Sequence, residues 1–232
     1  MVGQLAQGNT SLSLTLFSFL PAVFKLPFKN KLIEMATFEH TQEIIVKDSY
    51  GVRDYIKPGD VVIDAGANVG VFSNFAAKQG ATVYAFEPGR VAYEILKEDR
   101  EASVVPVNMG LGSRHFIAEL KIADGRLTTA TLADSGIAPH EGCKSETVEI
   151  TTIDDFARDK KLSRLNYIKI DTEGYEANIL RGAAETIKKH RPIIVMSSYH
   201  KPSDKTELPM ILNGITPYGV ELNGENFICK PI

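Results

Sequence analysis

Residues 61–70 read Val-Val-Ile-Asp-Ala-Gly-Ala-Asn-Val-Gly, and the fold class can be inferred from this stretch. Three consecutive β-branched residues predict a strand that is buried on both faces, as the strands of parallel sheets are. The glycine-containing turn after them leads into a helical pattern over residues 69–78. In an open parallel sheet such a turn lies at the carboxyl edge, where ligands bind. The stretch therefore predicts an α/β domain with a binding site at this turn.

Beyond the turn, short apolar runs alternate with amphipathic segments, which indicates βαβ units and a parallel sheet. Because the crossovers of such units are right-handed, we expect helices on both faces, that is, a Rossmann-like, doubly wound, mostly parallel sheet. The predicted strands are residues 61–63, 82–86, 104–107, 166–171 and 192–197, and the predicted helices are residues 69–78, 90–101, 152–160, 173–189 (with a break at Gly182) and 204–212.

Two segments depart from this alternation. Residues 116–122 and 146–150 alternate apolar and polar side chains, which predicts a small antiparallel insertion between about residues 115 and 150. Residues 123–145 lie between them and are predicted as a surface loop. The tail holds two more expected strands, at residues 218–222 and 226–230.

Composition limits the class of protein. The 232 residues suit one domain with modest additions, and 44% hydrophobic residues are enough for a buried core. The net charge is −3 and the pI is about 6.0, so a nucleic acid is not the expected partner. The only cysteines, Cys143 and Cys229, give neither zinc-site spacing nor a disulfide framework and are compatible with a reducing cytoplasm, the expected location.

The N-terminal segment, residues 12–28, is strongly apolar. It follows a stretch without Lys or Arg, unlike a secretory signal, and Pro21, Lys25 and Pro27 interrupt it, so it is a poor transmembrane span. We expect a helix that packs on the domain or mediates a homo-oligomer; peripheral membrane contact and an uncleaved targeting segment are the alternatives. Residues 1–50 are thus predicted as a helical apolar extension, and residues 51–232 as the binding domain.

The details of the turn discriminate between ligands. A dinucleotide fingerprint needs glycines where this chain has Asn68 and Val71, and no P-loop lysine is present. Asp64 would repel a diphosphate but attract the ammonium and sulfonium of S-adenosylmethionine. Gly66 and Gly70 permit positive φ angles and close backbone approach to a ligand. We therefore expect S-adenosylmethionine as the cofactor, with Asp64, Gly66, Asn68 and Gly70 at its binding site.

Two further positions fit this cofactor. Glu87 ends the second strand, 87 − 64 = 23 residues beyond Asp64, and is placed to accept hydrogen bonds from both ribose hydroxyls. Asn108 and Met109 follow the third strand and would flank the adenine with an amide and a soft apolar surface. Their alternative roles are those of a turn residue and a packed methionine.

The sequence contains the motifs VVIDAGANVG (61–70), FEP (86–88), TIDDF (152–156) and YIKIDTEGYE (167–176). Together they resemble the motifs of the FkbM-type methyltransferases, and the resemblance spans about residues 50–200. It implies a seven-stranded sheet whose last strand is antiparallel, and O-methylation by S-adenosylmethionine of acceptors that are often sugar or polyketide hydroxyls. Family members commonly carry Glu in the strand that here holds Ser197 and Ser198.

On the acceptor side, a hydroxyl needs a base within hydrogen-bond reach. Asp171 and Glu173 follow the fourth strand and can serve as base or bind vicinal hydroxyls, while the alternative for Asp171 is a helix cap. Two carboxylates can also hold a divalent cation, but they are few for a metal site, and none is predicted.

Lys169 and His200 complete the predicted catalytic set. Lys169 interrupts a buried strand on the same face as Asp171, so it is expected to pair with Asp171 or a neighbouring acid, or to orient the acceptor. His200 follows the fifth strand and is a candidate base or acceptor ligand, with a turn histidine as the alternative. Glu176 is expected to begin the next helix and to interact with its dipole.

Two other functions remain as alternatives at this stage. One is a non-catalytic cofactor-binding or membrane-associated scaffold, and the other is a nicotinamide-dependent oxidoreductase, which Asn68 and Val71 disfavour. The leading interpretation is a methyltransferase that acts on a small-molecule or glycan-like hydroxyl.

Overall fold

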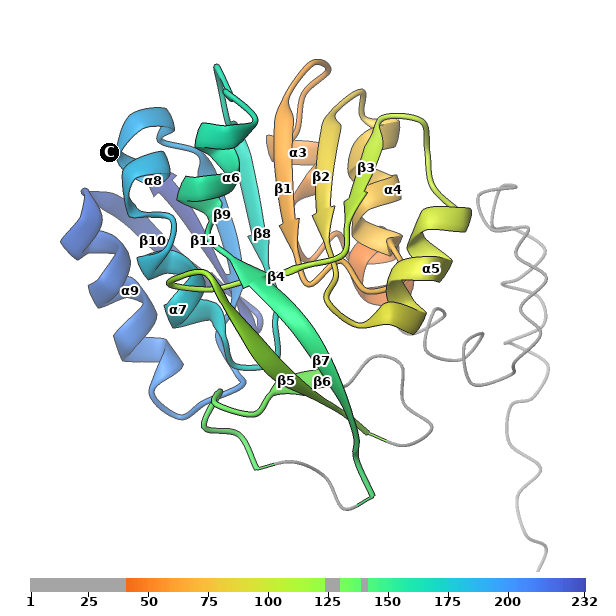
Figure 1. The fold of residues 1–232 in the computed structure, drawn as a ribbon. Helices are drawn as coiled ribbons and strands as arrows, with labels where there is room; N and C mark the ends of the chain where they lie inside the picture. The colour runs from red at the N-terminus through yellow and green to blue at the C-terminus, as the bar shows by residue number, and fades with distance from the viewer. Residues whose placement is uncertain (1–40, 124–129, 139–141) are drawn as a thin grey trace, which may run out of the picture. The chain divides into compact units, whose positions relative to one another are not determined.

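The central element is a seven-stranded sheet in a computed structural model that describes residues 41–123, 130–138 and 142–232 (Figure 1). The strand order is β10-β11-β9-β8-β1-β2-β3, and β11 alone runs antiparallel to the other six strands. The predicted doubly wound sheet and its antiparallel last strand are confirmed. The strands are β1 (Val61–Ala65), β2 (Thr82–Phe86), β3 (Val104–Val107), β8 (Tyr167–Ile170), β9 (Ile193–Ser197), β10 (Tyr218–Asn223) and β11 (Asn226–Pro231).

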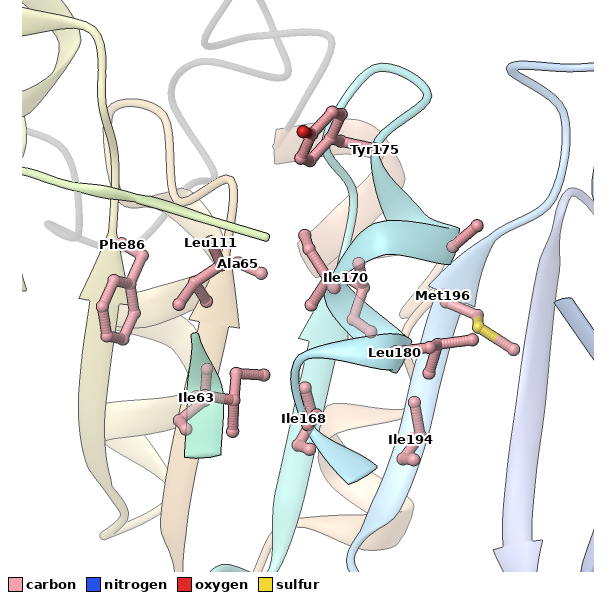
Figure 2. Packing of buried hydrophobic residues seen from close by; sticks show 14 of the residues in the cluster. Ile63, Ala65, Phe86, Leu111, Ile168, Ile170, Tyr175, Leu180, Ile194 and Met196 are labelled. Carbon is pink, nitrogen blue, oxygen red and sulfur yellow. The ribbon is translucent and has the colours of Figure 1, made fainter. Parts of the chain in front are cut away.

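Alternating side chains of the central strands face two different layers. Ile63 and Ile168 belong to the core cluster that also holds residues of α6, α7 and α8, as Figure 2 shows for Leu180. The intervening residues face α4, where Phe72 stacks on Tyr167. The helices are η1 (Thr41–Val46), α3 (Val52–Tyr55), α4 (Val71–Lys78), α5 (Arg90–Glu98), α6 (Ile153–Asp159), α7 (Glu176–Arg181), α8 (Ala184–His190) and α9 (Asp204–Ile215).

The predicted insertion is a second, four-stranded sheet of order β4-β7-β5-β6. The long strands β5 (Phe116–Ile122) and β7 (Lys144–Thr151) pair antiparallel, as expected, and β4 (Gly110–Leu111) runs parallel to β7. The predicted surface loop at residues 123–145 is wrong in one part, because β6 (Ala130–Leu132) pairs with β5 and buries Leu132.

Helix boundaries shift where the backbone takes positive φ angles. Helix α4 begins after Gly70, whose φ is 89°, and α7 begins only at Glu176 because Glu173 and Gly174 have φ angles of 52° and 92°. The predicted break at Gly182 is confirmed, since α7 ends there and α8 follows. Thr152 caps α6, because its hydroxyl oxygen accepts a 2.9 Å hydrogen bond from the Asp155 amide.

The predicted apolar segment at residues 12–28 lies outside the described residues, and so does most of the extension assigned to residues 1–50. Among residues 41–123, 130–138 and 142–232, no helix is long and apolar enough to cross a membrane.

Candidate active site

A cavity opens at the carboxyl ends of β1, β2 and β8. Strand order reverses between β1 and β8, and such a switch point is where open α/β sheets bind ligands. The lining combines backbone of the β1 turn, acidic side chains and aromatic rings. Among its residues are Gly66, Ala67, Asn68, Glu87, Gly110, Leu111, Lys169, Asp171, Glu173 and Tyr199.

The β1 turn packs tightly against the β8 turn. Gly66 has a φ of 77°, and a Cβ at this position would overlap the carbonyl oxygen of Asp171. The amides of Gly66 and Ala67 both donate to the Phe86 carbonyl, at 3.1 and 2.9 Å. Position 66 must therefore be glycine, because the β1 turn, β2 and β8 converge there.

Glu87 is buried at the cavity wall. Its carboxylate accepts hydrogen bonds from the backbone amides of Asn68 and Gly89, at 2.9 and 2.8 Å. Burial raises the pKa of Glu87, and although these two bonds and the charge of Lys169 oppose the shift, the pKa reaches about 7. A ligand that donates hydroxyl hydrogens to this carboxylate would favour its charged form.

Asp64 is fully buried and does not line the cavity. Its Oδ1 lies 3.0 Å from Lys169 Nζ, in register across β1 and β8, and its Oδ2 accepts a 2.7 Å bond from the Ser73 hydroxyl. The expectation that Asp64 attracts the cofactor's cationic groups directly is corrected, because Lys169 neutralises it. Asp64 instead supports the turn from the side of the sheet that faces α4.

Lys169 forms its ion pair with Asp64 and not with Asp171. Of the two partners expected from the sequence, Asp171 or a neighbouring acid, the structure therefore selects the neighbouring acid. Its Nζ also donates to the carbonyls of Gly66 and Ala65, at 2.7 and 3.3 Å. Burial opposes the charge, but the carboxylates of Asp64 and Asp171 raise the pKa of Lys169. This buried cation therefore holds the glycine turn in place.

Three more predicted cofactor residues stand behind the cavity rather than in its lining. Asn108 donates to the carbonyls of Glu87 and Pro88, at 2.9 and 3.0 Å, so it fixes the turn after β2. Met109 packs against the core cluster, and Gly70 precedes α4. Gly110 and Leu111, which sequence reasoning missed, occupy the wall expected for the Asn108–Met109 pair.

Asp171 lies at the end of β8 with both carboxylate oxygens engaged. Oδ1 accepts a 2.8 Å bond from the Ser197 hydroxyl, and Oδ2 accepts a 2.8 Å bond from the Tyr50 hydroxyl. Burial acts to raise the pKa of Asp171, but the charges of Lys169 and His200 and these two hydrogen bonds bring it below its ordinary value. Asp171 is thus a fixed carboxylate and a weak base.

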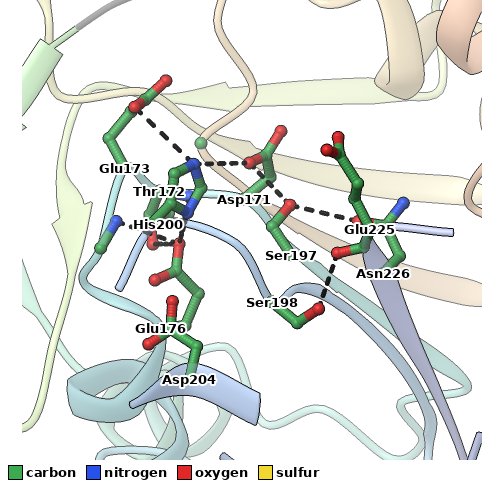
Figure 3. Close-up of polar contacts among 12 residues, drawn as sticks. Asp171, Thr172, Glu173, Glu176, Ser197, Ser198, His200, Asp204, Glu225 and Asn226 are labelled. Carbon is green, nitrogen blue, oxygen red and sulfur yellow. Dashed lines mark hydrogen bonds and ion pairs between the residues drawn. The ribbon is translucent and has the colours of Figure 1, made fainter. Parts of the chain in front are cut away.

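His200 lies between three carboxylates, as Figure 3 shows. Nδ1 lies 3.0 Å from Glu176 Oε1, while Nε2 lies 3.7 Å from both Asp171 Oδ1 and Glu173 Oε2. Burial lowers the pKa of His200, but the hydrogen bond and charge of Glu176 and the charges of Asp171 and Glu173 raise it to about 9. A ring protonated at neutral pH is unsuited to the predicted role of base.

Glu173 is the more basic of the two predicted acceptor-side carboxylates. Burial raises the pKa of Glu173, with a further contribution from the charge of Asp171, and His200 only partly offsets these effects. Its side chain is 35% exposed and lines the cavity. The structure therefore brings Asp171, Glu173 and His200 together, as the sequence predicts, but with different acid–base properties.

Sequence reasoning missed several residues of the acceptor side. Tyr50 and Glu43 precede the first strand, where no motif signals a function, and Tyr199 was visible only as the neighbour of His200. Ser197 was noted as a departure from the family pattern, and it now proves to bind Asp171. Glu176 does begin α7, as predicted, and its Oε1 also accepts bonds from the amides of Thr172 and Gly174.

The residues present fit S-adenosylmethionine. The turn at Gly66 lines the cavity, and Glu87 offers a buried carboxylate to ribose hydroxyls. In addition, Oδ1 of Asn68, which lines the cavity, is buried and has no hydrogen-bond partner in the described part of the chain. An unpaired buried polar atom in a cavity wall is what a bound polar ligand would satisfy.

Known proteins agree with this assignment. The methyltransferase FkbM domain matches residues 64–219. The hexuronic acid methyltransferase AglP of Haloferax volcanii is 25% identical over 184 residues, which cover 74% of each chain. The 31-O-demethyl-FK506 methyltransferase FkbM of Streptomyces tacrolimicus is 26% identical over 161 residues, covering 56% of this chain and 62% of its own. A methyltransferase FkbM from Methylobacillus flagellatus has a similar fold, with a TM-score of 0.52 at 16% identity over 86% of this chain and 55% of that chain.

The fold and the cavity define an S-adenosylmethionine-dependent methyltransferase. The domain matches well over half of this chain, so the chain belongs to the methyltransferase FkbM domain family. The family resemblance and the expected cofactor are thereby confirmed. The individual site residues are not tested by these relatives and stay predictions.

The pKa of Glu87 makes cofactor binding depend on pH. In its predicted role Glu87 accepts hydrogen bonds from the ribose hydroxyls in its charged form. With a pKa of about 7, that form rises from about a tenth of molecules at pH 6 to about nine tenths at pH 8. We therefore expect S-adenosylmethionine to bind about tenfold more tightly at pH 8 than at pH 6. Calorimetric titration at both pH values checks this, and Glu87→Gln should abolish the difference. Equal affinities in the wild-type protein would remove Glu87 from the ribose site.

Proposed function

We propose that the protein transfers the methyl group of S-adenosylmethionine to a hydroxyl oxygen of a sugar-like acceptor. The observation that carries this proposal is the pair of carboxylates, Asp171 and Glu173, that lines the cofactor cavity from the end of β8. Carboxylates are suited to binding hydroxyl hydrogens and to taking the proton of an attacking hydroxyl. The name of AglP, a hexuronic acid methyltransferase, supports an acceptor of this class.

The different basicities of the two carboxylates suggest a division of roles. Bound S-adenosylmethionine supplies a methyl group activated by the sulfonium. Asp171, held by Tyr50 and Ser197, orients the acceptor hydroxyl. Glu173, which has the raised pKa, takes its proton. Holding the two reactants in line in this way supplies much of the rate enhancement that such a displacement needs.

An aromatic ring adds to the proposed acceptor side. Tyr199 lines the cavity and is exposed to solvent. Its ring centroid lies 4.2 Å from that of His200. Burial and nearby carboxylates raise the pKa of Tyr199, so its hydroxyl stays protonated and can donate. An exposed ring with a polar end is suited to acceptors that have both apolar faces and hydroxyls.

A product assay tests the proposal. The full chain would be incubated with labelled S-adenosylmethionine and a panel of hexuronic acids, neutral hexoses and amines, and products would be located by mass spectrometry and NMR. We expect label on a hydroxyl oxygen of a carbohydrate, lost in Glu173→Gln. Label on nitrogen or carbon would overturn the O-methylation proposal, and S-adenosylmethionine binding without transfer to any member would favour the scaffold alternative.

A further inference from the structure

A second cavity adjoins the cofactor cavity at Glu43, which lines both of them. Its walls come from η1 and the residues after it, and from the turn between β10 and β11. We call it the polar pocket, and its lining residues are Gln42, Glu43, Lys47, Ser49, Asn223, Gly224, Glu225 and Asn226. All of them lie outside the four motifs that resemble the family, so the cofactor does not account for this pocket.

The polar pocket contains buried polar atoms that have no partner. Nε2 of Gln42 and Oγ of Ser49 are buried, and neither has a hydrogen-bond partner in the part of the chain that the structure describes. Buried polar atoms of native proteins are ordinarily paired, so an unpaired one calls for a partner from outside the fold. A polar ligand in the pocket would supply these missing partners.

Asn226 is a third group with unused hydrogen-bonding capacity. The residue is 2% exposed, and its Nδ2, which carries two hydrogens, donates to the Ser49 carbonyl at 3.2 Å. Its Oδ1 lies 3.3 Å from the Ser197 hydroxyl, but Oδ1 of Asp171 lies closer to that hydroxyl, at 2.8 Å. A hydroxyl has one hydrogen, and the charged acceptor takes it. The Asn226 amide can therefore still accept a hydrogen bond from a ligand.

The wall that carries Glu225 is held in place from behind. Its carbonyl accepts hydrogen bonds from both the amide and the hydroxyl of Ser198, at 2.9 and 2.8 Å (Figure 3). Gly224, with a φ of 62°, allows the chain to reverse between β10 and β11. A wall fixed in this way has little conformational freedom to lose when a ligand binds.

The lining offers both donors and acceptors. The Gln42 amide and the Lys47 ammonium donate hydrogen bonds, whereas the carboxylates of Glu43 and Glu225 accept them. An anionic ligand would use only the donors, and an ammonium group would use only the acceptors. A hydroxyl group both donates and accepts. The polar pocket is therefore suited to a ligand with several hydroxyl groups.

The balance of charge disfavours an acidic ligand. The charges of Asp171 and Glu225 both act on Glu43 and raise its pKa, in addition to the effect of burial, while Lys47 and Lys169 oppose the shift. The charge of Lys169 is already matched within its buried ion pair. Acidic groups thus exceed basic ones around Glu43, and a carboxylate on the ligand would be repelled.

We propose that the polar pocket binds an uncharged sugar residue of the acceptor, linked to the sugar residue whose hydroxyl is methylated. Two hydrogen bonds in series, through Ser197, connect Asp171 with Asn226, so one acceptor can contact both the proposed reaction site and the pocket. This inference rests on the function proposed above and narrows it. The acceptor contains at least two linked sugars, and the pocket discriminates against a hexuronic acid at the second one.

Sugar binding can be measured without methyl transfer. The full chain, saturated with S-adenosylhomocysteine, would be titrated with three neutral disaccharides (maltose, cellobiose and lactose), with digalacturonic acid and with the disaccharide of glucosamine, by saturation-transfer NMR and calorimetry. We expect a neutral disaccharide to bind at least tenfold more tightly than the acidic and the amino one.

Two variants test the pocket itself. Gln42→Leu removes the unpaired amide at similar size and should weaken binding of the neutral disaccharide about 3–10-fold, the effect of one lost hydrogen bond. Glu225→Gln removes one charge and should strengthen binding of digalacturonic acid about fivefold. Neither residue lines the cofactor cavity, so an unchanged affinity for S-adenosylmethionine shows that each variant is folded.

Glu221→Gln is the matched control. It makes the same substitution on the same hairpin, at an exposed carboxylate outside the polar pocket, and should leave all sugar affinities unchanged. No binding of any neutral disaccharide, equal affinities in Gln42→Leu and the wild-type protein, or tighter binding of the acidic or amino disaccharide would overturn the inference. Because these readouts need no turnover, a failed sugar pocket and a failed methyltransferase proposal give different results.

Discussion

Asp171→Asn is expected to lower the rate of methyl transfer by about 10²–10⁴-fold. Asparagine keeps the size of the side chain and an oxygen that can accept from Ser197, which lies 2.8 Å away. It loses the negative charge that would attract the acceptor hydroxyl. The cofactor cradle is formed by other residues, so the affinity for S-adenosylmethionine should change little. Initial rates of S-adenosylhomocysteine release, together with calorimetric titration of the cofactor, measure the two effects separately.

Glu221→Gln provides the control for this change. Glu221 is an exposed carboxylate on β10 and does not line the cavity, so its loss should leave the rate close to that of the wild-type protein. A wild-type rate in Asp171→Asn would exclude this residue from the reaction. If cofactor binding fell as much as the rate, Asp171 would have a structural role only.

Lys169→Met is expected to lower the free energy of unfolding by about 3–5 kcal/mol. The variant leaves the fully buried carboxylate of Asp64 without its cation, and only the Ser73 hydroxyl remains beside it. It also removes the donor to the Gly66 carbonyl, so S-adenosylmethionine should bind more weakly. For a domain of this size the loss corresponds to a fall in Tm of about 10 °C, which thermal unfolding followed by circular dichroism measures.

Two further variants show whether the unpaired charge of Asp64 causes the loss of stability in Lys169→Met. Lys188→Met removes a half-exposed lysine paired with Glu185 and should shift stability by less than about 0.5 kcal/mol. The double variant Asp64→Asn/Lys169→Met removes both charges of the buried pair and should be more stable than Lys169→Met alone. If Lys169→Met unfolds like Lys188→Met, the pair contributes nothing to the fold.

The local pattern of the sequence predicted the layered α/β fold well. Buried strands such as Val61–Ala65 and helices such as α4 have periodicities that depend only on neighbouring residues. The short strand β6 was missed because its only signal is pairing with β5, which lies several residues away across residues that read as a loop. The start of α7 was placed too early because the positive φ at Glu173 has no signature in its side chain.

The candidate site was predicted in part. Strand ends marked Glu87, Asp171, Glu173 and His200, since carboxyl ends of parallel strands converge at one edge of a sheet. The sequence predicted that Lys169 pairs with Asp171 or with a neighbouring acid. Only the register of β1 and β8 selects Asp64 as the partner. The acidities could not be predicted, because they depend on burial and on charges that come from distant segments.

The sequence by itself determined the alternation of strands and helices in the main sheet, the glycine turn, the candidate acidic residue at the end of β2 and the resemblance to a methyltransferase family. Short motifs are enough to predict these features, because each feature depends on backbone geometry within one βαβ unit. Only the tertiary structure decided that Tyr50 and Ser197 hold Asp171 from two sides, that Asp64 pairs with Lys169, and that His200 lies among three carboxylates. The physical reason is that these contacts join residues from 24 to 121 positions apart, and their distances and electrostatics exist only once the sheet has brought its edges together.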